Sequence, residues 1–363
     1  MPLLMIPGPV PVSEDVLAAL ALPVRSHTSA DNATTVRGIQ AGVRACVGST
    51  DARVHVFAGS GTLAMEAAIV NFARPGDRIV VCSHGFFGDR FADIAAAFGI
   101  DADVVRSEWG GHVAMESVRR ACANGRPPAL VAVTHVDTSS GVLADAQAIA
   151  SCCADSGALL VLDGVCATGG IVEAMDAWGY DVVLTGAQKA LGVPPGLAIV
   201  AVSEAARRRR GELGSIPAYY ADLARWDPVV DDPTRYFSTH ATSMLRALEV
   251  SLDAIAAEGL QRRFARHERV ADSLREGMAG LGFSLLTQEA LLAPTLSVLA
   301  VPPGVDEAQL RADMAEAGVI VAGCLGAFAG RGIRIGHMGK VDAAEVETTL
   351  AAAAAALARQ RGG

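Results

Sequence analysis

The sequence predicts an α/β protein with a mostly parallel central sheet in a large domain and a smaller α/β domain towards the C-terminus. Short runs of β-branched and apolar residues alternate with Ala-rich helical stretches, which is the rhythm of βαβ units. The 363 residues, 51% of them hydrophobic, are enough to bury a sizeable core. We therefore expect two domains that share one interface.

The expected strands of the central sheet are short and almost continuously apolar, which is typical of strands covered on both faces. They are residues 54–57, 78–82, 102–105, 130–134, 159–162, 182–184 and 197–202. Helices at about 62–72, 87–98 and 145–155 are expected to supply the cover.

A long helical pattern begins near residue 244 and runs towards Gly280. Expected strands at 296–301 and 333–335 and an Ala-rich final helix follow it. The predicted division is an extended segment at 1–15, a large domain at 16–243, and a linking helix with a small domain at 244–363. The four arginines at 207–210 are expected to form a solvated helix face.

Charge and hydropathy exclude several classes of partner. A net charge of −9 and a pI near 5.4 leave no basic face for nucleic acid. No apolar run approaches 18 residues and the first residues lack the regions of a signal peptide, so we expect a cytoplasmic protein with no membrane partner. A mean hydropathy of +0.35 without a membrane span favours a large subunit interface, and hence a homodimer.

Cysteine and histidine spacing predicts neither disulfides nor a metal. The seven cysteines form no CxxC pair and their number is odd, so they are expected to be reduced thiols. The eight histidines are scattered, and no HExxH or comparable spacing occurs.

Polar residues follow the expected strands, where ligands of open α/β sheets bind. Ser60, Gly61 and Thr62 come between a strand and a helix, so backbone N–H groups, hydroxyls and the helix dipole would face an anion such as phosphate. The alternative is an ordinary glycine turn with a threonine cap. No GxxxxGK[ST] motif occurs, which argues against nucleoside triphosphates.

Two ionisable residues stand out at the ends of buried strands. Asp163 follows 159–162 directly, so its carboxylate needs either a cationic partner or a capping role. The chain has only two lysines, although Lys and Arg together number 30. Lys340 lies in a plausible surface turn, whereas Lys189 follows a buried strand, where desolvation would favour a neutral amine able to form an imine.

Five motifs together resemble the class V aminotransferases, and among them the alanine–glyoxylate and serine–pyruvate aminotransferases. They are SGT at 60–62, HGFFGDR at 84–90, THVDTSSG at 134–141, LVLDG at 160–164 and TGAQKALGVPPG at 185–196. Their order and spacing match, and the similarity extends from Pro7 to Arg334. The resemblance implies the fold-type I architecture, pyridoxal 5'-phosphate (PLP) as cofactor, and a dimer with active sites at the subunit interface.

The resemblance also assigns roles around the cofactor phosphate. Ser60, Gly61 and Thr62 would hold the phosphate with help from Gln188. Tyr236 and Thr239 match a stretch that reaches the phosphate of the neighbouring subunit, which would make dimerisation catalytic. A merely structural role is the alternative for Gln188, Tyr236 and Thr239.

Around the ring, the resemblance makes Lys189 the residue that forms the Schiff base and Asp163 the partner of the pyridine nitrogen. Phe87 would stack on the ring, unless it is a core residue. Thr138 would lie near the phenolic oxygen, unless it only satisfies the loop backbone. Arg334 matches the arginine that binds the substrate carboxylate, for which its bidentate fork is suited.

The expected reaction is transamination between a small amino acid of the alanine, serine or glycine type and glyoxylate or pyruvate, because only Arg334 matches a carboxylate site. A 2-aminoethylphosphonate-type aminotransferase is one alternative. A cysteine desulfurase or related lyase is another; it needs a nucleophilic cysteine, and Cys324 lies near the required position. A non-catalytic protein of the same fold is the alternative outside enzymes.

Overall fold

The computed structural model describes residues 2–361, and its central sheet has seven strands in the order β2-β8-β7-β6-β5-β3-β4. The strands are β2 (Arg53–Gly59), β3 (Arg78–Ser83), β4 (Asp101–Arg106), β5 (Leu130–Thr134), β6 (Leu159–Asp163), β7 (Val182–Gly186) and β8 (Gly196–Val202). β8 runs opposite to the other six strands, because it pairs antiparallel with β2 and β7 while the remaining pairs are parallel. The predicted α/β class with a mostly parallel sheet is confirmed.

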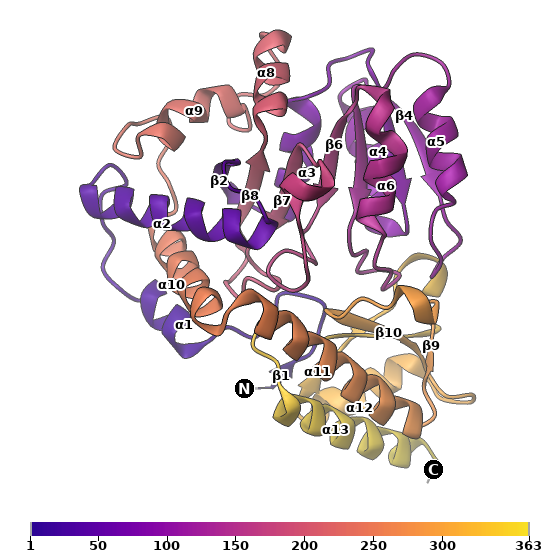
Figure 1. The fold of residues 1–363 in the computed structure, drawn as a ribbon. Coiled ribbons are helices and arrows are strands. Elements are labelled where there is room, and N and C mark those ends of the chain that lie inside the picture. Colours follow the sequence, from indigo (N-terminus) through magenta and orange to yellow (C-terminus); the bar gives the residue numbers. More distant parts are fainter. Residues whose placement is uncertain (1, 362–363) are drawn as a thin grey trace.

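Helices cover both faces of this sheet, because alternate strand residues point to opposite sides. Val80 and Cys82 of β3 belong to one apolar core, and Ile79 and Val81 belong to the other. The first core is closed by α2 (Ala30–Val47), α5 (Met115–Ala123), α6 (Ala146–Cys153) and α10 (Thr242–Glu258). The second is closed by α3 (Gly61–Val70), α4 (Phe86–Ala97), α8 (Glu204–Leu213) and α9 (Leu223–Asp231) (Figure 1).

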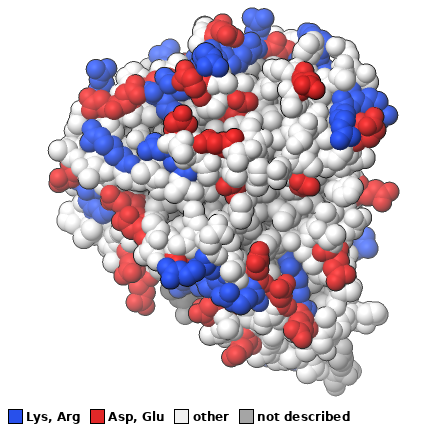
Figure 2. Space-filling model, in the orientation of Figure 1, with Lys and Arg blue, Asp and Glu red and all other residues white. Residues whose placement is uncertain are grey.

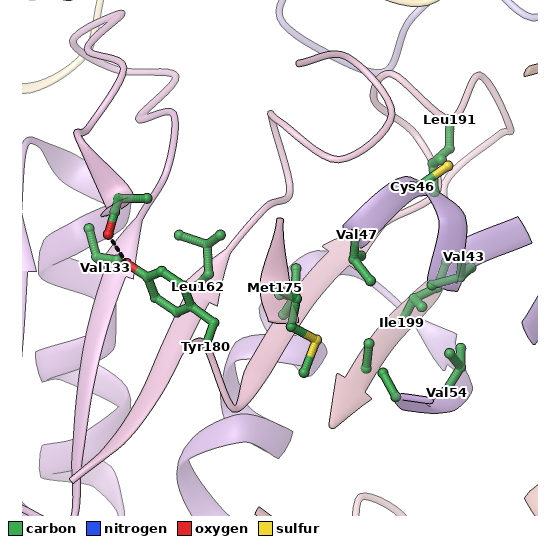
Figure 3. Packing of buried hydrophobic residues seen from close by; sticks show 14 of the residues in the cluster. Val43, Cys46, Val47, Val54, Val133, Leu162, Met175, Tyr180, Leu191 and Ile199 are labelled. Atoms are coloured by element: carbon green, nitrogen blue, oxygen red, sulfur yellow. Dashed lines mark hydrogen bonds between the residues drawn. The ribbon is translucent and has the colours of Figure 1, made fainter. Parts of the chain in front are cut away.

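Figure 3 shows how the first core is packed. Val43 and Val47 of α2 lie close to Ile199 of β8, so the helix is held by side-chain packing. Tyr180 is fully within the same core, and its hydroxyl donates a 2.9 Å hydrogen bond to the carbonyl of Ala146. The one polar atom of this ring is therefore satisfied.

The C-terminal part forms a second layer below the first (Figure 1). Its antiparallel sheet has the order β12 (Ala322–Gly323), β13 (Gly332–Gly336), β10 (Leu296–Ala300) and β9 (Ser284–Leu285). Three helices pack with it around a separate apolar core: α11 (Leu260–Gly280), α12 (Glu307–Glu316) and α13 (Ala343–Arg361). The shorter helices α1 (Glu14–Leu20) and α7 (Met175–Trp178) pack on the first core of the central sheet through Val16 and Met175.

The N-terminal segment ties the two layers together. Its strand β1 (Leu3–Leu4) pairs in parallel with β11 (Val319–Ile320), and the N–H of Gly336 donates to the carbonyl of Met5 at 2.8 Å. Farther along, the N–H of Val10 donates to the carbonyl of Gln188 at 3.1 Å. Residues 5–10 therefore run from the small sheet to the end of β7.

Two sequence expectations are wrong. The helical pattern from 244 to 280 is broken into α10 and α11 at Gly259, whose φ of +81° a helix cannot continue through. The face at 207–210 is not fully solvated, because Arg210 is buried and lies 2.6 Å from the carboxylate of Asp222. A buried carboxylate partner, distant in sequence from the arginine run, turns this residue inward.

Within residues 2–361 no helix is both long and apolar enough to cross a membrane, and no group of three or more His, Cys, Asp or Glu side chains is placed to hold a metal ion. All seven cysteines are free thiols and six are buried. Figure 2 shows acidic and basic side chains interspersed over one face of the molecule, without a large region of a single sign.

Candidate active site

A cavity of about 280 Å³ lies beyond the carboxyl ends of the parallel strands. Strands β2, β5, β6 and β7 all end at this edge, because β8 is antiparallel to both of its neighbours. Eight predicted site residues line the cavity: Ser60, Gly61, Thr62, Phe87, Thr138, Asp163, Gln188 and Lys189. Three do not line it: Arg334, Tyr236 and Thr239.

The N-terminus of α3 forms one wall. Ser60 occupies the N-cap position with extended backbone, yet its hydroxyl makes no capping hydrogen bond. The N–H groups of Gly61 and Thr62 precede the first carbonyl-bonded turn and have no acceptor within residues 2–361. A Cβ on Gly61 would lie 2.9 Å from Cγ2 of Val165, so glycine permits this close approach. The result is an N-terminus whose donors remain free for an anion.

Phe87 is held at the start of α4 by a buried carboxylate. The N–H groups of Phe87 and Gly88 both donate to Oδ2 of Asp137 at 3.0 Å. The N–H and hydroxyl of Ser139 donate to Oδ1 at 2.9 and 2.5 Å. Burial raises the pKa of Asp137, and these hydrogen bonds oppose the rise. The first turn of α4 is therefore fixed against the loop that carries Thr138.

Asp163 ends β6 as a buried acid without a cation. Its carboxyl accepts hydrogen bonds from the N–H of Val165 at 2.9 Å and from the hydroxyl of Thr134 at 3.4 Å. No arginine, lysine or histidine forms an ion pair with it within residues 2–361. Burial raises its pKa to about 7. Such a carboxyl is poised to pair with a cationic group in the cavity.

Lys189 reaches the cavity from the turn after β7, and burial lowers the pKa of its amine. Its Nζ donates a hydrogen bond to the carbonyl of Pro7. A Cβ on Gly8 would lie 2.6 Å from Cδ and 2.9 Å from Nζ of Lys189. The N-terminal segment therefore lies directly on this side chain.

Arg334 lies on β13 beside the cavity. Its Nε donates to the carbonyl of Gly323 at 2.8 Å, and one terminal nitrogen donates to the carbonyl of Thr138 at 3.1 Å. Neither partner is charged, and burial lowers the pKa of the guanidinium. The charge of Arg334 also contributes to the lowered pKa of Lys189, so the two cations are neighbours.

The exposed pair Tyr236 and Thr239 lies outside the cavity of its own chain. The side chain of Tyr236 is 67% exposed and its ring centroid is 5.3 Å from that of His27. Their predicted contact with a neighbouring subunit stays a prediction. The ring of His135 lies 3.1 Å from the carboxylate of the buried Glu173.

The sequence reasoning missed three features of the site: the cation Arg90, the buried acceptor Asp137 and the segment Pro7–Gly8. Arg90 and Asp137 lie within the HGFFGDR and THVDTSSG motifs, and Pro7 begins the region of similarity. The resemblance therefore covers all three features. The sequence does not show, however, which of these segments lie close together in the folded chain.

Comparisons with known proteins show the family and the fold of the chain. The class V aminotransferase family matches residues 17–328. The chain is 34% identical to the protein named soluble hydrogenase, small subunit, of a Synechococcus strain, over 98% of this chain and 93% of that one. It is 33% identical to alanine–glyoxylate aminotransferase 1 of Saccharomyces cerevisiae, over 93% and 91%. A crystal structure of alanine–glyoxylate aminotransferase from Nostoc sp. superposes with a TM-score of 0.95 at 29% identity, over 98% and 95%.

Proposed function

Because the chain belongs to the class V aminotransferase family, a family of PLP-dependent enzymes, we propose that it transfers an amino group between a small amino acid and glyoxylate or pyruvate. The donor is of the alanine, serine or glycine type. The observation that carries the proposal is the pair Lys189 and Asp163, a buried amine with a lowered pKa and a buried acid without a cation, in one cavity.

The residues present fit PLP. Asp163 offers an unpaired carboxyl for the protonated pyridine nitrogen, and Lys189 offers an amine for the aldehyde. The free N–H groups at Gly61 and Thr62 suit the phosphate. Gln188 lines the same cavity and its Oε1 is buried without a hydrogen-bond partner among the described residues, so its amide would contribute at the phosphate end. Thr138 lines the cavity between these groups and Arg334.

When bound, PLP supplies a conjugated ring that accepts electrons from the substrate's Cα. The protein supplies proton transfer and orientation. Asp163 keeps a proton on the pyridine nitrogen, because the alternative is an unpaired buried carboxylate. The amine of Lys189, whose pKa burial lowers, would take the proton from the substrate's Cα as general base and, as general acid, would deliver it to the carbon that carried the cofactor's aldehyde.

Arg334 binds the substrate carboxylate in this proposal. Its two hydrogen bonds to carbonyl oxygens leave the guanidinium charge without an anionic partner, and they aim it next to Thr138. A substrate carboxylate would neutralise this charge by accepting two parallel N–H hydrogen bonds from the guanidinium. One such cation at the substrate end favours monocarboxylic substrates.

Dimerisation is part of the proposal. The exposed Tyr236 and Thr239 would reach the cofactor phosphate of a second subunit, which explains why a large tyrosine is 67% exposed. The desulfurase alternative loses support, because burial raises the pKa of Cys324 to about 12 and so opposes formation of the thiolate.

The two lysines make a direct test possible. Reduction with sodium borohydride after incubation with PLP should attach the cofactor to the peptide that contains Lys189. The variant Lys189→Ala should lose this product, whereas the matched control Lys340→Ala, at an exposed position, should keep it. Cofactor on neither lysine would contradict the proposal.

The donor is identified by the visible spectrum of the PLP-loaded protein. Alanine, serine, glycine and 2-aminoethylphosphonate are added separately, and glyoxylate or pyruvate is then added to reverse the change. A response to the phosphonate alone would replace the proposed donor class. A response to none of them would contradict transamination of small amines.

A further inference from the structure

The charges that line the cavity do not balance the cofactor that it fits. Within residues 2–361 the lining has two basic side chains, Arg90 and Lys189, and one acidic side chain, Asp163. Lys189 is engaged with the aldehyde in the proposed function, and Asp163 with the ring nitrogen. The proposed phosphate ligands Ser60, Gly61, Thr62, Gln188, Tyr236 and Thr239 are all neutral. A phosphate with nearly two negative charges would meet only the partial charge of the α3 N-terminus.

Arg90 lies where the missing charge is needed. It projects from the second turn of α4, and its terminal nitrogen donates a 3.0 Å hydrogen bond to the hydroxyl of Thr62. Thr62 is at the free N-terminus of α3, so Arg90 and the unbonded N–H groups of α3 face the same end of the cavity. No carboxylate forms an ion pair with Arg90 in the described part of the chain, whereas the adjacent Asp89 is taken by Arg106 at 2.9 Å.

Arg90 also covers the ring of Phe87. Its guanidinium carbon lies 4.7 Å from the centroid of that ring and 5.2 Å from that of Phe86. With the guanidinium over one face of Phe87, the opposite face is left for a second planar group. The same side chain thus contacts both the proposed stacking residue and the proposed phosphate cradle.

We propose that Arg90 is a further cofactor-binding residue, which neutralises the phosphate of PLP across Thr62 while its guanidinium stacks on Phe87. This inference rests on the proposed function. In this arrangement the two arginines at the site have different roles: Arg90 binds the phosphate, and Arg334 binds the substrate carboxylate. Among the described residues that line or adjoin the cavity, a second carboxylate of the substrate would have no arginine of its own.

The test compares PLP with pyridoxal, which lacks the phosphate. Arg90→Gln should weaken PLP binding roughly 10- to 100-fold, the range for loss of a charge-assisted hydrogen bond, and should change pyridoxal binding less than about threefold. Arg90→Lys should recover most of the PLP affinity, because it restores the charge. Arg119→Gln on α5 is the matched control, since it removes an exposed arginine paired only with Glu116. Dissociation constants from absorbance titrations are the readout.

Equal weakening of PLP and pyridoxal in Arg90→Gln would overturn the inference, because Arg90 would then only support Phe87. Unchanged PLP binding would overturn it as well. A different result would overturn the proposed function: wild-type protein without PLP on Lys189 after borohydride reduction. That result would remove the basis of this inference as well.

A second measurement needs no variant. Phenylglyoxal modifies arginines, and mass spectrometry locates the modified peptides of the wild-type protein. Inorganic phosphate should protect Arg90 while Arg119 stays reactive. Arg90 that remains equally reactive at saturating phosphate would contradict the assignment, even if Arg90→Gln does not fold.

Discussion

Asp163 gives the strongest prediction at the scale of single residues, because burial without a cationic partner in residues 2–361 raises its pKa. Burial raises its pKa from 3.8 to about 7, so the folded protein keeps a proton that the unfolded chain releases above pH 4. Stability without cofactor should therefore fall by roughly 4 kcal/mol as the pH rises from 4 to 7 on account of this group. Below pH 4 Asp163 causes no such loss of stability, and above pH 7 the loss is complete.

Other buried groups oppose this trend, so the measurement must be a difference. His84, His240 and His267 have pKa values lowered to about 4, and they favour the folded state as the pH rises. Urea unfolding of wild type and Asp163→Asn at several pH values isolates the acid. Asp163→Asn should gain stability relative to wild type between pH 4 and 7, and bound PLP should reduce the gain. A constant difference across this range would refute the assignment.

Asp137 leads to a second prediction at the same scale. Its carboxylate accepts four hydrogen bonds, three of them from backbone N–H groups, and Asp137→Asn would turn an N–H2 group towards some of these donors. We expect a loss of about 2–3 kcal/mol, typical of unsatisfied buried donors. The control Asp145→Asn keeps an oxygen that accepts the exposed N-cap hydrogen bond from the N–H of Ala148, so it should cost less than about 1 kcal/mol.

Stability alone does not separate positioning from packing, so cofactor binding is the second readout. Asp137→Asn should weaken both PLP and pyridoxal, because Phe87 meets the ring that the two share. This differs from the expected behaviour of Arg90→Gln, which concerns the phosphate. An Asp137→Asn variant that is destabilised but binds both compounds normally would show that Asp137 has no positioning role.

At the scale of elements, the sequence predicts what periodicity and strand ends encode. The apolar runs locate all seven strands of the central sheet, and the positions of Asp163 and Lys189 after two of them follow from the chain alone. Gly259 shows the limit of periodicity: the helical pattern of apolar residues continues across it, but the helical backbone is interrupted there. Contacts between distant segments, such as Pro7 with Lys189 or Arg90 with Thr62, need the register of the sheet and lie beyond local patterns.

The N-terminal segment gives a prediction at this scale. A Cβ on Gly8 would collide with the side chain of Lys189, so Gly8→Ala should move the segment or the lysine. We expect the share of protein with PLP reduced onto Lys189 to fall at least tenfold, a cost of more than about 1.4 kcal/mol at the site. Mass spectrometry after borohydride reduction measures this share.

The matched control is Gly304→Ala. Gly304 also has a positive φ, +81°, but a Cβ there has open space around it. Both variants pay the backbone strain of an alanine in this region, roughly 1 kcal/mol. Equal effects of the two variants on the Lys189 product would mean that backbone strain, and not contact with Lys189, accounts for the loss.

At the scale of the whole molecule, one chain supplies most but not all of the proposed phosphate contacts. Tyr236 and Thr239 are exposed and lie outside the cavity of their own chain, so their predicted role needs a second copy. In a C2 dimer each active site would then combine Lys189 of one subunit with Tyr236 of the other. This arrangement can be separated from a purely structural role by mixing two inactive variants.

Lys189→Ala and Tyr236→Ala are co-expressed with different tags, and the mixed dimer is purified. In that dimer one site lacks both residues, and the other has the wild-type lysine together with the wild-type tyrosine of the other subunit. If Tyr236 acts across the interface, the mixed dimer should show about half of the wild-type activity per dimer, while Lys189→Ala dimers are inactive and Tyr236→Ala dimers bind PLP weakly. If Tyr236 acts within its own chain, no site in the mixed dimer is intact. Activity no higher than that of the Tyr236→Ala dimers would then exclude the shared site, even where light scattering shows a dimer.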